Sequence, residues 1–269
     1  MSFLQVLDVH KTFGGPNGPV EALRGVEFSL REGEFMVMVG PSGCGKSTLL
    51  QIIAGLEKAD RGEVILRGER IRGWGRERVL IFQEPHLFPW LTVRENIEFG
   101  LKVMGVPKGE RRKVSERFIA VMGLQGFDDH YPHELSGGMR QRVALARALA
   151  VDPLVLLMDE PFASVDAITR SRLQGELEKI WMHYHKTIIF VTHNLREALL
   201  LGSRIALLTP RPGRIKAIFE VDIPRPRQNK LKEMAWWETF LMRELEALTG
   251  EDPLDRPSPR SHGVQEGDL

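Results

Sequence analysis

The segment Gly40-Pro-Ser-Gly-Cys-Gly-Lys46-Ser47 restricts the fold of this chain more than any other feature. It fits the pattern G-x-x-x-x-G-K-[ST], in which a glycine-rich loop joins a strand to a helix. The apolar run 35–39 before it predicts a buried strand, and the pattern over 46–54 after it predicts a helix. A glycine-rich turn that binds no ligand is the alternative, and this strand and helix context disfavours it.

The chemistry of such a loop follows from its backbone. Glycines let N–H groups turn toward an anion without Cβ clashes, and the helix start adds partial positive charge. We therefore predict that Lys46 reaches the β- and γ-phosphates of a nucleotide and that Ser47 binds Mg²⁺. The residues expected to contact the nucleotide here are Gly40, Pro41, Ser42, Gly43, Cys44, Gly45, Lys46, Ser47 and Thr48.

Further short apolar runs predict an α/β protein. The runs 79–82, 154–158, 187–192 and 205–209 are continuous rather than alternating, as in a parallel sheet covered on both faces. Helical patterns over 138–150 and 167–183 separate several of them, so strand and helix alternate along the chain. We expect a mostly parallel core, the arrangement of P-loop NTPases.

Two other regions differ from this core. The runs 4–9 and 26–30 alternate roughly in twos, and 63–66 adds a short strand, which predicts an antiparallel β subdomain. Residues from about 84 to 150 hold mainly helical patterns, which predicts a helical subdomain. We expect a single domain over 1–250, closed by a helix over 230–248, and a disordered tail over 251–269 that is rich in Pro, Asp, Arg and Gly.

Composition excludes several classes of function. The 269 residues carry a net charge of +1, so the whole-chain charge gives no case for nucleic-acid binding. The single cysteine, Cys44, cannot form an intramolecular disulfide, which fits a reducing compartment. No window approaches the roughly 18 apolar residues of a membrane span. Any role at a membrane therefore requires another chain.

Two carboxylates end the apolar run 154–158. Asp159 at this strand end can reach a magnesium shell, and Glu160 can take a proton from an attacking water. An ordinary polar strand end is the alternative, and the phosphate loop in the same chain favours the catalytic interpretation.

The segment Leu135-Ser-Gly-Gly-Met-Arg-Gln141 predicts a second helix start that can bind an anion. Ser136 can cap the helix, and the glycines allow close backbone approach. A simple helix cap is the alternative when this segment is considered by itself.

Taken together and in order, these motifs resemble the ATPase subunits of ABC transporters over roughly residues 3–225. The order is the phosphate loop, Gln83, the segment 135–141, Asp159-Glu160, Ser164-Val-Asp166 and His193. Ala163-Ser-Val-Asp166 departs conservatively from the usual Ala-Leu-Asp. The resemblance implies an adenine stack for Phe13, contact with Mg²⁺ and the attacking water for Gln83, and a grip on the γ-phosphate for His193.

In this family two subunits complete each site. The resemblance implies that Ser136, Gly137 and Gly138 bind the γ-phosphate held by a partner copy, and that Asp166 crosses the dimer interface. A homodimer would then close on ATP and Mg²⁺ and open after hydrolysis. Membrane permease subunits and, indirectly, an extracytoplasmic solute-binding protein would be its partners, with the chain at the cytoplasmic face of the membrane.

Features of the chain also suggest which kind of ABC protein it is. The segments 83–93, 161–166 and 210–214 resemble importers of nitrate, sulfonates or taurine. The segment 83–93 carries Trp90 among prolines and aromatics and is the expected permease contact, with helical-subdomain core as its alternative. Two other classes stay open. A DNA-repair or translation ATPase is disfavoured by the single ATPase unit, and a non-hydrolytic nucleotide switch is disfavoured by Glu160.

Overall fold

The computed structural model describes residues 2–16 and 18–249 of the chain. Its centre is a six-stranded sheet with the order β10-β9-β3-β8-β7-β6. Neighbouring strands from β9 to β6 run parallel, and only β10 is antiparallel to its neighbour. The predicted α/β class with a mostly parallel core is confirmed. The strands are β3 (Phe35–Val39), β6 (Arg78–Ile81), β7 (Val155–Asp159), β8 (Thr187–Thr192), β9 (Arg204–Leu208) and β10 (Ile215–Glu220).

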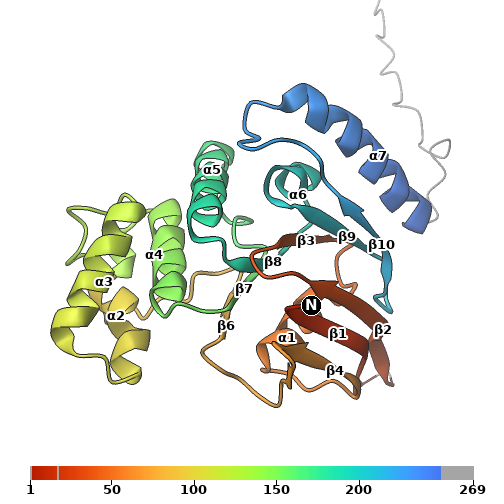
Figure 1. Cartoon of the computed structure of the whole chain (residues 1–269), viewed down its shortest axis with the longest axis horizontal. Helices are drawn as coiled ribbons and strands as arrows, with labels where there is room; N and C mark the ends of the chain where they lie inside the picture. The colour runs from red at the N-terminus through yellow and green to blue at the C-terminus, as the bar shows by residue number, and fades with distance from the viewer. Residues whose placement is uncertain (1, 17, 250–269) are drawn as a thin grey trace, which may run out of the picture.

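A second, antiparallel sheet lies beside the first, as the alternating runs near the N-terminus predict (Figure 1). Its order is β2-β1-β4-β5. Register shifts after Val6 and Val9 let β1 continue well past the predicted run. These shifts interrupt the alternation that the sequence shows, so the full lengths were not predictable. The strands are β1 (Leu4–Phe13), β2 (Val20–Leu30), β4 (Arg61–Leu66) and β5 (Glu69–Arg70).

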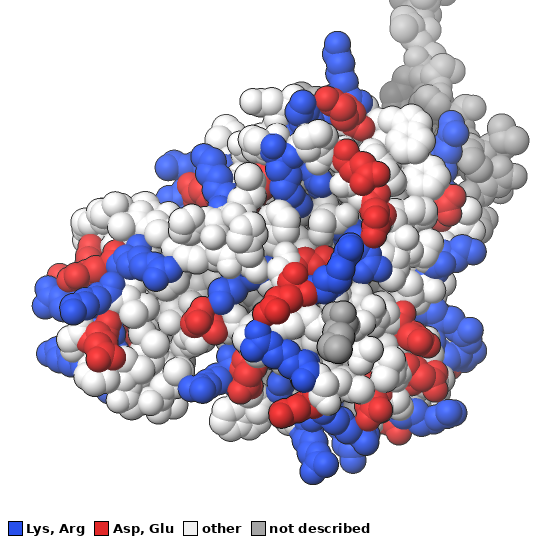
Figure 2. Space-filling view, viewed as in Figure 1, with Lys and Arg blue, Asp and Glu red and all other residues white. Residues whose placement is uncertain are grey.

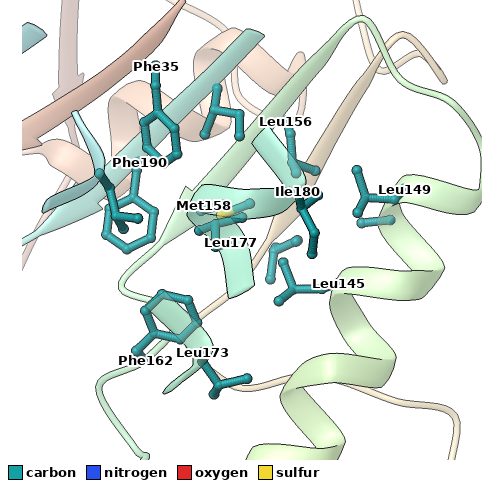
Figure 3. Close-up of a cluster of buried hydrophobic side chains, with 14 of the residues drawn as sticks. Phe35, Leu145, Leu149, Leu156, Met158, Phe162, Leu173, Leu177, Ile180 and Phe190 are labelled. Carbon is teal, nitrogen blue, oxygen red and sulfur yellow. The ribbon is translucent and has the colours of Figure 1, made fainter. Parts of the chain in front are cut away.

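The helices divide between the two faces of the parallel sheet. Alternate residues of one strand separate into two cores: Phe35, Val37 and Val39 join one, whereas Met36 and Met38 join the other. The antiparallel sheet and α1 cover the second core. The remaining helices supply the first core, and Figure 3 shows Leu145 and Leu149 of α4 directed at the sheet residues Leu156 and Met158.

Figure 1 shows α2, α3 and α4 gathered at one side of the molecule. Thr92 starts α2 with a capping box, because its hydroxyl accepts from Glu95 N and the Glu95 carboxylate accepts from Thr92 N. The division into a single domain with a helical subdomain over about 84–150 stays a prediction. The helices are α1 (Lys46–Ala54), α2 (Val93–Val103), α3 (Lys108–Val121), α4 (Gly137–Ala150), α5 (Ala167–Tyr184), α6 (Leu195–Leu201) and α7 (Leu231–Thr249), with a 3₁₀ turn, η1 (Pro132–Glu134).

The C-terminal helix α7 packs on the body of the protein. Met234 and Leu241 are buried in the first core, and α7 lies along α6. The predicted tail 251–269 falls outside the described residues. On the face shown in Figure 2, basic and acidic side chains are interspersed, in keeping with the near-neutral net charge.

Candidate functional site

The phosphate loop connects β3 to α1 and holds its lysine inward. Lys46 is 6% exposed. Its Nζ donates to the carbonyl oxygen of Gly40 at 2.7 Å and to that of Pro41 at 2.9 Å. The Lys46 ammonium therefore lies across the loop at the start of α1. An anion bound there would interact with this charge and with the backbone N–H groups of the first helical turn.

Two glycines are required by the way this loop is braced. Gly45, the N-cap of α1, has φ 100°, and an added Cβ would lie 2.6 Å from Leu23 Cδ2 of β2. A Cβ on Gly213 would lie 2.0 Å from the carbonyl oxygen of Cys44. Gly213 N also donates to Ala22 O at 2.9 Å. The turn 210–214, which the sequence singles out only by its resemblance to importers, thus packs against the phosphate loop and supports it.

Cys44 lies inside the loop as a buried thiol. Burial raises its pKa, and the nearby Lys46 charge lowers the pKa less than burial raises it. Cys44 is therefore mostly protonated at neutral pH, and a protonated thiol is a poor nucleophile. Its role here is packing: it is 1% exposed and belongs to the core under the antiparallel sheet.

Asp159 and Glu160 stand at the end of β7, at the edge of the sheet where the phosphate loop begins. Burial raises the pKa of Asp159, a hydrogen bond from Ser47 lowers it, and the Glu160 charge raises it further. Glu160 has φ 43°, a left-handed conformation that is uncommon for a residue with a side chain. Its N–H donates to Val191 O at 3.0 Å, which holds this strained residue in place.

The structure brings His193 and Glu160 together. His193 follows β8, and β8 pairs in parallel with β7 so that Asp159 lies opposite Val191. His193 Nδ1 and Glu160 Oε2 are 2.7 Å apart. The His193 side chain is 64% exposed, whereas that of Glu160 is 23% exposed. The pair thus presents an accessible ring backed by a less accessible carboxylate.

Two further residues with expected roles are exposed. Gln83 follows β6, which pairs with β7, so it lies at the same sheet edge as Asp159. Phe13 ends β1 and is 37% exposed, with the Lys11 ammonium 5.1 Å from its ring centre. An exposed ring of this kind can receive a planar base.

The segment that opens α4 lies on the other face of the sheet from α1. Ser136 is exposed, and its hydroxyl accepts from Met139 N at 3.3 Å. Gly138 is buried against Thr169 of α5. Asp166 caps α5 by accepting from Thr169 N at 3.0 Å, and this bond lowers the pKa of its carboxyl. Ser136 and Asp166 both face outward.

Trp90 does not belong to the core, which answers the alternative left open by the sequence. It is 69% exposed, and its ring centre lies 5.7 Å from that of Phe88. Phe88 lines an apolar groove of about 350 Å³ together with Phe99 and Arg147. By contrast, Val93 is buried and Leu87 packs against the core.

Arg147 is the unusual member of this groove. It donates to the carbonyl oxygens of His86 at 2.8 Å and Pro85 at 3.0 Å, and its guanidinium lies 5.5 Å from the Phe88 ring centre. Burial lowers its pKa. The groove is thus apolar with one cationic element at its wall. Among the described residues, no helix has the length and apolar character that crossing a membrane requires.

Comparisons with known proteins agree with this geometry. A family model described as ABC transporter matches residues 23–163. A taurine import ATP-binding protein of Roseobacter denitrificans is 49% identical over 80% of this chain and 81% of its own length. An aliphatic sulfonates import ATP-binding protein of Bacillus cereus is 48% identical over 83% of this chain and 88% of its own. Among solved structures, the dimeric post-hydrolysis state of an ATP-binding cassette with ADP and Pi has a TM-score of 0.72 at 32% identity, covering 82% of this chain and all of that one.

Proposed function

This chain belongs to the ABC transporter family of ATP-binding proteins, and from that premise we propose that it is the ATP-hydrolysing subunit of an importer for a small solute such as nitrate, a sulfonate or taurine. The observation that carries the proposal is the 2.7 Å contact between His193 and Glu160, at the sheet edge that also bears Lys46. A phosphate loop binds nucleotides in many proteins, but this carboxylate–imidazole pair supplies what hydrolysis needs.

The residues present fit a magnesium ion. Ser47 and Asp159 are hydrogen-bonded oxygen donors, and Gln83 stands at the same edge of the sheet. The raised pKa of Asp159 means that the free-energy cost of burying its charged carboxylate exceeds the stabilisation that neighbouring groups of the chain provide. A divalent cation at its oxygens would supply that offset, and bound there it would neutralise charge on the β- and γ-phosphates.

The chain's own residues then divide the work. Lys46 and the loop N–H groups bind and orient the phosphates. Glu160 accepts the proton of the attacking water, and its contact with His193 keeps the two side chains together. Phe13 stacks on the adenine, and Gln83 orients the water.

Phosphate release from ATP tests this proposal. The purified full-length chain should release phosphate when Mg²⁺ is present and lose that activity when the metal is chelated. A folded protein that binds ATP with Mg²⁺ yet releases no phosphate would make it a nucleotide switch instead.

The outward-facing residues support a homodimer. Ser136, Gly137 and Asp166 are exposed, and with the adjoining Gly138, which is buried against Thr169, they would complete the site of a second copy. The dimeric state of the related cassette agrees with this arrangement. Two such copies related by a two-fold axis would close both sites around ATP together.

Transport requires permease subunits, which this chain would meet at the cytoplasmic face of the membrane as a peripheral protein. Trp90 and the adjoining groove offer the contact, because exposed aromatics often dominate interface energy. Trp90→Glu should weaken permease association and solute uptake while leaving phosphate release by the isolated chain unchanged. Thermal melting separates this result from misfolding, and normal uptake by a stable Trp90→Glu protein would exclude this surface. The solute itself, delivered by an extracytoplasmic binding protein, is fixed by the partner chains.

A further inference from the structure

A buried carboxylate lines the same small pocket as His193. Glu197, in the first turn of α6, is 5% exposed. Its Oε2 accepts from the Thr192 hydroxyl at 2.5 Å and its Oε1 accepts from Gln174 Nε2 at 2.9 Å. Burying a carboxylate costs free energy unless its oxygens are hydrogen-bonded, and both are bonded here by neutral side chains.

These bonds fix the residues on either side of His193. The Thr192 hydroxyl, besides donating to Glu197, accepts from Asn194 N at 3.0 Å. The Asn194 side chain in turn accepts from Glu197 N at 3.1 Å. The backbone that carries His193 is therefore held before and after the ring by one connected set of hydrogen bonds, all of which include Thr192 or Glu197.

The other end of the set lies on α5. Gln174 is 9% exposed and sits two turns into the helix that Asp166 caps. Through Gln174 and Glu197, the position of His193 is tied to the helix whose first residues face outward. Glu160, His193 and Glu197 also line one small, partly open pocket of about 40 Å³ with Arg170. Glu197 thus stands at the back of the Glu160–His193 pair.

We propose that Glu197 is a positioning residue: by binding Thr192 on one side and Gln174 on the other, it holds His193 in contact with Glu160. The proposal rests on the ATPase function proposed above. Glu197 touches no substrate. It acts by fixing the backbone of residues 192–194 against α5, so that the ring keeps its 2.7 Å contact with the carboxylate.

Two substitutions of Thr192 separate the effect of the hydroxyl from that of the methyl group. Thr192→Val keeps a β-branched side chain in β8 but removes the bond to Glu197. Thr192→Ser restores the hydroxyl without the methyl group. The matched control is Ser115, fully buried in α3, whose hydroxyl donates to Glu98 at 2.8 Å. Ser115→Ala removes a comparable bond to a carboxylate in another part of the protein.

The expected results separate positioning from stability. Thr192→Val should lower kcat about 10-fold with KM for ATP changed less than about 2-fold, as a small misplacement of a reacting group does. Thr192→Ser should recover most of the loss. Ser115→Ala should keep the kcat of the unchanged protein although its melting temperature falls. Equal losses of kcat in Thr192→Val and Ser115→Ala would overturn the proposal, as would full activity in Thr192→Val.

A spectroscopic measurement follows the ring itself. In the full-length chain labelled with ¹⁵N-histidine, the His193 ring resonances should move in Thr192→Val and in Gln174→Met but stay in Ser115→Ala. Gln174→Met removes the hydrogen bond from α5 to Glu197. It replaces Thr192→Val in this measurement if Thr192→Val does not fold. An unmoved His193 signal in a folded variant would overturn the proposal. Because this readout needs no turnover, it stands apart from the phosphate-release assay: absence of ATPase activity in the unchanged chain would count against the proposed function only.

Discussion

The phosphate loop and the segment that opens α4 are both glycine-bearing helix starts, yet their surroundings differ. At α1 the N-cap is Gly45, which offers no side-chain bond to the first turn, and Lys46 is folded across the loop. At α4 the exposed Ser136 already accepts from Met139 N. We call the α1 start the enclosed start because its lysine is buried, although Ser42, Gly43 and Ser47 are exposed. We call the α4 start the outward start because Ser136 and Gly137 are exposed.

This difference shows which of the two helix starts has phosphate-binding groups around it within one chain. The enclosed start has the charge, the braced glycines and the neighbouring Asp159 of β7 that a phosphate chain and its metal need within one chain. The outward start has a braced glycine, Gly138 against Thr169, and a nearby charge on Arg140. It lies away from Asp159, because α4 covers the other core, against α2, α3 and α5. In the proposed homodimer, the N–H groups of this start would meet the phosphate held by the second copy.

The largest effect should follow from changing the base of the enclosed half-site. Glu160→Gln keeps the shape and the contact with His193 but cannot take a proton, so phosphate release should fall roughly 10²- to 10⁴-fold. ATP binding should persist, and the variant should accumulate as a nucleotide-bound dimer, measured by size-exclusion chromatography with ATP. Turnover at the rate of the unchanged protein would remove Glu160 from the chemistry.

The loop lysine should give the next largest effect. Lys46→Ala removes the cation that is proposed to bind the β- and γ-phosphates, and losing one charged hydrogen bond to them costs about 1.5–3 kcal/mol, or roughly 10- to 100-fold in ATP affinity. Isothermal titration measures this affinity, and circular dichroism checks that the fold is kept. ATP binding of undiminished strength by the folded variant would contradict the assignment of the phosphate loop.

Elements whose ends are marked by a clear change in residue type were predictable from the sequence. The strand Phe35–Val39 and the helix Lys46–Ala54 were predicted with the bounds that the structure has, because a continuous apolar run meets a glycine-rich loop. The strand Thr187–Thr192 was predicted equally well. By contrast, α6 is only seven residues long, and β10 follows a turn whose packing the sequence does not reveal.

For the candidate site, the residue types could be predicted from the sequence, but the distances between them could not. Glu160 and His193 meet because β7 and β8 are neighbours in the sheet, and that strand order depends on the packing of the whole chain. The bracing of Cys44 by Gly213 and the hydrogen bonds of Glu197 likewise join segments far apart in sequence. The catalytic and binding roles assigned to these residues stay predictions that the experiments here address.

Mixing two inactive variants tests directly whether the outward start serves a second copy. Lys46→Ala damages the enclosed half-site, and Ser136→Arg damages the outward one. In a mixed dimer both defects fall on one composite site and the other is intact, so an equal mixture should regain about a quarter of full activity if one site suffices. The measurement is phosphate release after subunit exchange, with mixed dimers proven by two affinity tags. No recovery in proven mixed dimers would count against shared sites or against the sufficiency of one.

The smallest effect concerns stability and has opposite signs in the two regions. Burial gives Asp159 a pKa above 3.8 in the folded protein, so the folded state binds more protons than the unfolded chain, and this group destabilises the protein as pH rises through that window. Asp166 has the reverse shift, since its bond from Thr169 N lowers its pKa, and its stabilising contribution is lost as pH falls through that lowered value. At neutral pH, Asp159→Asn should therefore raise the melting temperature and Asp166→Asn should lower it.

If Asp159→Asn raises the free energy of unfolding by about 1 kcal/mol, the melting temperature of a protein of this size should rise by about 2–4 °C. Differential scanning calorimetry without nucleotide resolves a change of this size. The gain should shrink when Asp159→Asn is compared with the unchanged protein as pH falls through the raised pKa of Asp159, because more of the carboxyl is then protonated. Added ATP and Mg²⁺ should reverse the order, since the carboxylate is the group that the metal stabilises. A melting temperature lowered by Asp159→Asn at neutral pH would mean that the buried carboxylate is already satisfied within the chain, and the enclosed half-site would then lack the unmet charge that favours a divalent cation.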